Sequence, residues 1–183
     1  MTDDKPRIAP GTFRDIGLVN TVITRIIGLA TGGTPPNIFA TLARHRGLFR
    51  RWLFFAGGLM PFGKLKRSES ELVILYVAHL MRCEYEWLHH QSLGRKAGVS
   101  DEAMERIRRE EIDSDQFTAR ERAFLRACRD IHTDGVIADG TYGELASLAN
   151  DKEIIELCFL IGHYRMLAVT LNTLRVPLDE HPA

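Results

Sequence analysis

Residues 68–98 read SESELVILYVAHLMRCEYEWLHHQSLGRKAG, and this stretch indicates how the rest of the chain is arranged. Its first part, residues 72–81, is apolar on every side of a helical wheel except at His79. A helix that is apolar all round is a buried helix. We therefore expect it to be the central helix of the domain.

The second part of the stretch carries side chains of the kinds that take part in catalysis. Cys83, Glu86 and His90 are spaced at i, i+3 and i+7, which places them on one face of a helix. A thiol, a carboxylate and an imidazole then lie beside the most buried helix. This is the constellation in the chain that points to catalysis.

The flanking sequence predicts further helices and no strand, because no segment alternates with period two. Start signals are Thr34 before Pro35 and the capping boxes Ser68/Glu71, Thr118/Glu121 and Thr141/Glu144, with Asn150/Glu153 as a looser version. The expected helices span residues 16–30, 35–45, 48–59, 68–81, 83–98, 100–109, 118–132, 142–149 and 151–175. The apolar stripe of residues 16–30 indicates packing on the core or on a partner subunit rather than on a membrane surface. Glu71-Leu-Val-Ile-Leu and Glu153-Ile-Ile-Glu-Leu hint at an internal duplication.

Composition excludes several classes of function. Lys plus Arg and Asp plus Glu are equal at 24 each, so the excess of basic charge that nucleic-acid binding needs is absent. No uninterrupted apolar run approaches the length of a membrane span, and the start, MTDDKP, is unlike a secretory signal. The three cysteines are widely spaced without a CxxC pair. These features predict a reduced, cytoplasmic protein without structural disulfides.

Each of these candidate catalytic residues also has a purely structural interpretation. Cys83 could be a small buried hydrophobe. Glu86 and His90, at i and i+4, could be an ordinary surface pair worth about 0.2–0.5 kcal/mol. Glu71 could serve only as the fourth residue of a capping box. Glu86-x-x-His89 matches the Glu-x-x-His of di-iron bundles, but those need a second copy, which the sequence lacks. A metal held by Cys83, Glu86 and His90 would be unusual, so we expect neither metal nor cofactor.

The central stretch resembles the carboxymuconolactone decarboxylase family, in its alkylhydroperoxidase D-like (AhpD-like) branch. The resemblance rests on Glu71, Cys83, Glu86 and His90 within VAHLMRCEYEWLHH, and on the following GRKAGVSDE. It extends more loosely over residues 35–178, including IGHY at 161–164. It implies an all-α orthogonal helical bundle of about eight to nine helices that forms homo-oligomers. The expected organisation is an arm and amphipathic helix (1–34), the family domain (35–178) and a tail (179–183).

The resemblance also implies roles for these residues. The peroxidase branch uses Glu…Cys-x-x-Cys-x-x-x-His, in which two cysteines cycle between dithiol and disulfide. Glu71, Cys83 and His90 match that pattern, Glu86 replaces the second cysteine, and Tyr85 stands where a histidine can occur. A carboxylate cannot take part in thiol–disulfide exchange, so the dithiol cycle looks lost unless Cys128 or Cys158 approaches Cys83.

Three hypotheses follow. The first is a small-molecule enzyme in which His90 moves protons, Glu86 orients it, Glu71 assists and Cys83 is auxiliary, in a pocket between the central helices. The second is a one-cysteine, peroxiredoxin-like protein in which Cys83 reacts with peroxide. The third is a non-catalytic, oligomeric helical protein.

Overall fold

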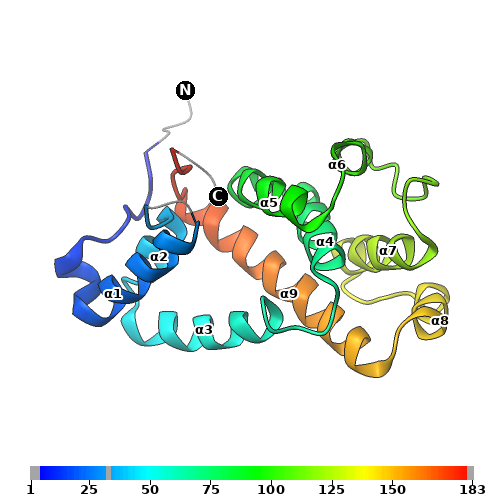
Figure 1. Ribbon diagram of the computed structural model, residues 1–183, viewed down its shortest axis with the longest axis horizontal. Coiled ribbons are helices and arrows are strands. Elements are labelled where there is room, and N and C mark those ends of the chain that lie inside the picture. The colour runs from blue at the N-terminus through cyan, green and yellow to red at the C-terminus, as the bar shows by residue number, and fades with distance from the viewer. Residues whose placement is uncertain (1–4, 32–33, 181–183) are drawn as a thin grey trace.

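The computed structural model describes residues 5–31 and 34–180, and in those ranges it contains nine helices and no strand (Figure 1). The helices are α1 (Phe13–Thr31), α2 (Asn37–Leu42), α3 (Arg46–Leu59), α4 (Arg67–Leu80), α5 (Glu84–Ala97), α6 (Asp101–Arg108), α7 (Ala119–Thr133), α8 (Asp139–Leu148) and α9 (Asp151–Leu174). The predicted all-α class is confirmed, and each expected helix is present with shifted ends.

Helix α4 is the centre of the fold, as its sequence predicts. Every residue from Glu69 to Ala78 is buried, and α4 packs against α5, α6, α7 and α9. The long helix α9 runs between the α1–α3 side and the α6–α8 side of the molecule (Figure 1). By length and composition α9 could cross a membrane, yet half of that apolar window is buried against other helices, as in a core helix.

Some predicted helix starts are correct and others are wrong. Ser100, Thr118 and Asn150 each cap a helix with the side chain. Thr34 does not cap α2, since Pro36 forces Pro35 out of the helical region and the helix begins at Asn37.

Two predicted capping boxes do not form. Helix α4 begins one residue before Ser68, and Glu69, not Glu71, accepts the Lys66 backbone N–H at 3.3 Å. Helix α8 already begins at Asp139, and Glu144 pairs with Arg126 at 2.6 Å. Glu71 is thereby left for another role.

The turn between α4 and α5 fixes the position of Cys83. Arg82 N–H donates to His79 O at 3.0 Å and Cys83 N–H to Ala78 O at 2.9 Å, which is the Schellman pattern. Arg82 takes the left-handed position of that motif with φ 51°, where glycine is usual. Asn172 of α9 donates from Nδ2 to Met81 O at 3.1 Å and holds the turn against α9.

Helix α1 is amphipathic, but it buries polar side chains and exposes apolar ones. It is bent at Gly17, which has φ 77°. Beyond the bend Asn20 and Thr24 are buried, whereas apolar side chains on the other face are exposed. The exposed set is Leu18, Val19, Val22, Ile26 and Leu29. The apolar stripe is therefore only partly covered by the rest of this chain.

Candidate active site

All four residues singled out from the sequence are buried where α4 meets α5. Glu71 lies in the second turn of α4 and is 0% exposed. Cys83 is the N-cap residue of α5, and Glu86 and His90 follow on that helix; these three are 1%, 3% and 7% exposed. Burial of so many ionisable groups is costly unless they are paired or neutral, and the structure contains both solutions.

Glu71 and His90 form the paired part of the site. Glu71 Oε2 lies 2.7 Å from His90 Nδ1, a hydrogen bond between two buried side chains. Arg67 Nη2 approaches the other oxygen, Oε1, at 2.6 Å, but its angle makes an ion pair rather than a hydrogen bond. The bond between α4 and α5 thus fixes the imidazole by Nδ1 and leaves Nε2 without a hydrogen-bond partner in the described part of the chain.

Glu86 forms the neutral part of the site. Neither carboxylate oxygen has a partner with hydrogen-bond geometry among the described residues. Burial raises the pKa of this carboxyl to about 8, with the Cys83 thiol acting in the opposite direction. Glu86 is therefore largely protonated at neutral pH. The sequence suggested that Glu86 orients His90, but the imidazole is hydrogen-bonded to Glu71 instead.

Cys83 is a poor nucleophile in this environment. Burial raises the pKa of its thiol to about 12, and the neighbouring Glu86 carboxylate adds to that effect. The helix N-terminus does not overcome these influences. Cys83, Cys128 and Cys158 are all free thiols.

An aromatic shell from α9 and α5 encloses His90. The Tyr164 ring meets the His90 ring edge-on, with centroids 5.1 Å apart, and His163 lies beside Tyr164 at 5.2 Å. Burial lowers the pKa of both His89 and His163 to about 4, so both are neutral at pH 7. The sequence drew attention to 161–164 only through the family resemblance, since a histidine and a tyrosine in an apolar helix carry no signal of their own.

Tyr85 ties the surroundings together on the same helix. Its hydroxyl donates to Asp179 Oδ2 at 2.6 Å and accepts the Ile38 backbone N–H at 3.1 Å. Asp179 Oδ1 in turn accepts the Asn37 N–H at 2.8 Å. The C-terminal segment and the start of α2 are thus fastened to the start of α5.

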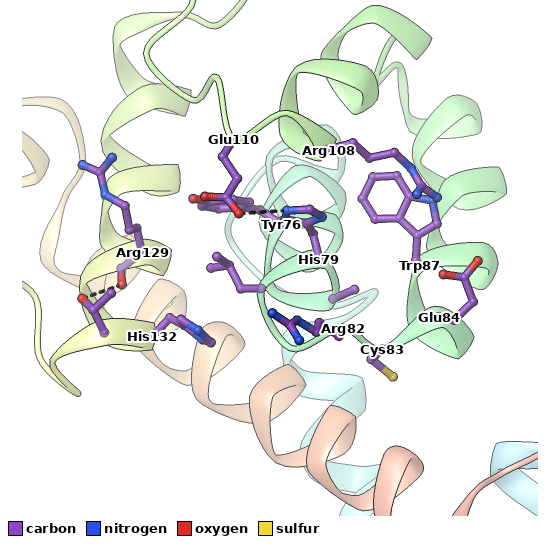
Figure 2. Close-up of a pocket in the computed structure, with 13 residues that line it drawn as sticks. Tyr76, His79, Arg82, Cys83, Glu84, Trp87, Arg108, Glu110, Arg129 and His132 are labelled. Carbon is purple, nitrogen blue, oxygen red and sulfur yellow. Dashed lines mark hydrogen bonds and ion pairs between the residues drawn. The ribbon is translucent and has the colours of Figure 1, made fainter. Parts of the chain in front are cut away.

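A cavity of about 550 Å³ opens beside this cluster, between the ends of α4, α6 and α7 and the start of α5 (Figure 2). Of the four residues expected in the site, Cys83 lines this cavity, whereas Glu71, Glu86 and His90 are not among its lining residues. In the described ranges no group of three His, Cys, Asp or Glu side chains is arranged to hold a metal ion.

Comparison with known proteins concerns the family likeness and the fold. The carboxymuconolactone decarboxylase family model matches residues 46–130, which include α3 to α6 and most of α7. A search of curated proteins gives no match.

Solved structures share the fold at low identity. An uncharacterized peroxidase-related protein from Silicibacter sp. TM1040 has a TM-score of 0.83 and 17% identity, covering 100% of this chain and 97% of its own. The alkylhydroperoxidase AhpD core protein from Ralstonia eutropha JMP134, also peroxidase-related, has a TM-score of 0.81 and 16% identity. The match covers 94% of this chain and 93% of that protein. The debrominase Bmp8 has a TM-score of 0.79 and 16% identity, and the match covers 96% of this chain and 93% of that protein. The central helices of the chain thus match the carboxymuconolactone decarboxylase family model, and its fold is shared with AhpD-like proteins.

Proposed function

We propose that the protein is a small-molecule enzyme whose proton-transfer unit is His90 held by Glu71. The observation that carries this proposal is the 2.7 Å hydrogen bond from His90 Nδ1 to a fully buried carboxylate that is itself paired with Arg67. A base that is oriented through one ring nitrogen works through the other, so Nε2 is the atom that exchanges a proton with substrate.

The neighbouring groups support acid–base chemistry of this kind. Glu71 is a positioning residue that holds the imidazole by Nδ1, and Arg67, 2.6 Å from the other carboxylate oxygen, keeps Glu71 in place. Glu86, largely protonated at neutral pH because its pKa is about 8, supplies a second proton donor on the same helical face. An oriented imidazole beside a neutral carboxylic acid is what a proton-shuttling site needs.

A one-cysteine redox activity is the second candidate. Cys83 lines the cavity, and a debrominase and peroxidase-related proteins share the fold. A thiolate is the reactive form of cysteine, however, and burial raises the pKa of Cys83 to about 12. The acid–base proposal is therefore preferred. A third, non-catalytic role predicts turnover of neither kind.

A substrate panel distinguishes these possibilities. Purified protein would be assayed for decarboxylation and hydrolysis of small carboxylated lactones, and separately for peroxide reduction with an added dithiol. We expect lactone turnover that falls by about 10²–10⁴-fold in His90→Gln and survives in Cys83→Ala. Peroxide reduction that is lost in Cys83→Ala and retained in His90→Gln would contradict the proposal, and absence of both activities would favour the non-catalytic role.

We also propose that the partner of this chain is a second copy of itself, and that the protein works in the cytoplasm. The exposed apolar face of α1 supports self-association, and α3, which packs against α1 and α9, and α9 itself also expose apolar side chains. Those residues include Phe54 and Phe55 on α3 and Phe159 and Met166 on α9. The three free cysteines support a reducing compartment.

A further inference from the structure

We propose that the cavity bordered by α4 to α7 is a second site, separate from the Glu71–His90 pair, that binds a small, planar organic monocarboxylate. The cavity volume of about 550 Å³ lies within the range of small-molecule pockets. Its lining combines guanidinium groups with aromatic and aliphatic side chains, so that both halves of an amphipathic anion find partners there.

The cationic part of the cavity comes from Arg82, Arg108 and Arg129. All three line the cavity, and none forms an ion pair with a residue in the described ranges, whereas nearby Arg106, Arg109 and Arg126 are all paired with carboxylates. Arg108 instead lies over the Trp87 ring at 4.2 Å from its centroid. Figure 2 shows His79 of α4 and Arg82 of the turn that follows projecting into the space that α5, α6 and α7 border. A planar guanidinium without a carboxylate partner is suited to hold a carboxylate from a ligand.

The backbone at the rim points to the same cavity. Three residues other than glycine have positive φ in the described chain, and two of them, Arg82 and Glu110, line this cavity. Each occupies the left-handed position of a Schellman turn, as Gly98 does at the end of α5. A charged side chain is thus kept at both rim positions where glycine would be less strained, and such positions cluster at functional sites.

The anion class follows from the rest of the lining. Tyr76, Leu80 and Trp87 form an apolar wall for a flat hydrocarbon body. Glu84 and Glu110 also line the cavity, and Glu110 Oε1 lies 3.4 Å from His79 Nε2. These carboxylates oppose a doubly charged ligand such as phosphate. Two polar atoms of lining residues, Trp87 Nε1 and His132 Nδ1, are buried without a hydrogen-bond partner among the described residues.

The two tryptophans provide a direct test. In ¹⁵N-labelled protein, titration with benzoate should shift the indole N–H signal of Trp87 and leave that of Trp52, which does not line the cavity, in place. Benzamide, the neutral isostere, and inorganic phosphate should each bind more weakly than benzoate. Arg82→Gly should weaken benzoate binding about tenfold or more, since a charge-assisted hydrogen bond is lost.

Arg175→Gly is the matched control, because Arg175 holds the same left-handed position at the end of α9 and does not line the cavity. It should bind benzoate as wild type does. Arg108→Gln, at an exposed side chain, should weaken binding independently of the turn. Equal shifts with benzoate and benzamide, phosphate binding as tight as benzoate, or unchanged benzoate affinity in both Arg82→Gly and Arg108→Gln would overturn the proposal.

Discussion

Glu86 is a carboxylic acid whose ionised form has no support in the fold. Its pKa rises from 4.5 to about 8 through burial, so the folded state binds a proton more tightly than the unfolded chain between those values. The stability associated with this proton is fully present below pH 4.5 and is lost as the pH rises through about 8.

Glu86→Gln should remove this pH dependence. The variant should match the wild type near pH 5 and exceed it in free energy of unfolding at pH 8–9, with the gap growing by at most about 1.4 kcal/mol per pH unit. Urea unfolding of both proteins from pH 5 to 9 measures the gap. A constant difference across that range would show that Glu86 does not hold an elevated pKa.

Cys83 should be almost inert as a nucleophile, because burial and the Glu86 carboxylate raise its pKa to about 12. With iodoacetamide at pH 8, the exposed Cys158 should be alkylated first and Cys83 only on unfolding. Peptide mapping by mass spectrometry follows each site separately. Alkylation of Cys83 in the folded protein as fast as that of Cys158 would revive the one-cysteine alternative.

At the scale of the element, Cys83 and Glu86 stand at the start of α5 with the spacing of a Cys-x-x-Cys pair. Cys83 is the N-cap residue and Glu86 is the third residue of the helix, one turn away. A Cys-x-x-Cys pair at a helix N-terminus closes a disulfide readily.

Glu86→Cys should therefore form a disulfide with Cys83 under mild oxidant, whereas the wild-type protein should keep Cys83 free. Peptide mapping in a Cys158→Ser background would detect the bond without interference from the exposed thiol. A folded variant that retains free thiols at both positions would mean that the correspondence between residues 83 and 86 and the family motif is wrong.

The elements also show what sequence reasoning could and could not supply. The burial of residues 72–78 of α4 follows from the sequence, since that part of the helix has no polar face. The Glu71–His90 bond does not, because it depends on how α4 and α5 pack, and the i, i+4 spacing of Glu86 and His90 suggested the wrong carboxylate. The capping-box interpretation of Glu71 was wrong because the helix begins at Arg67, one residue before Ser68. The Glu71 carboxylate forms an ion pair with Arg67 and a hydrogen bond with His90 instead.

At the scale of the whole molecule, α1 presents more apolar surface than this chain covers. Exposed Val22 and Ile26 lie opposite buried Asn20 and Thr24, an arrangement that a monomer has no reason to keep. The sequence revealed the apolar stripe, but not that Asn20 and Thr24 would face the domain beside Ile16 while much of the stripe stays exposed. The sequence predicts a pocket between the central helices, but not that the cavity would lie at the ends of four helices and be lined by Cys83 without Glu71, Glu86 or His90.

Self-association should give a mass that is a multiple of 20.7 kDa in light scattering. The double variant Val22→Asp, Ile26→Asp should shift the protein toward the monomer by placing charges in the interface. Val136→Asp, on an exposed valine between α7 and α8, is the matched control and should not change the mass. A monomeric wild-type protein at micromolar concentration would remove the self-association proposal.

The central claim is that Glu71 fixes His90 through Nδ1 and leaves Nε2 to exchange protons. Long-range ¹H–¹⁵N NMR of the imidazole nitrogens tests it without a substrate. In wild type, the neutral His90 ring should carry its proton on Nδ1 and show a pyridine-like ¹⁵N shift at Nε2, and in Glu71→Gln this preference should weaken. A wild-type His90 whose neutral ring carries the proton on Nε2 would contradict the claim.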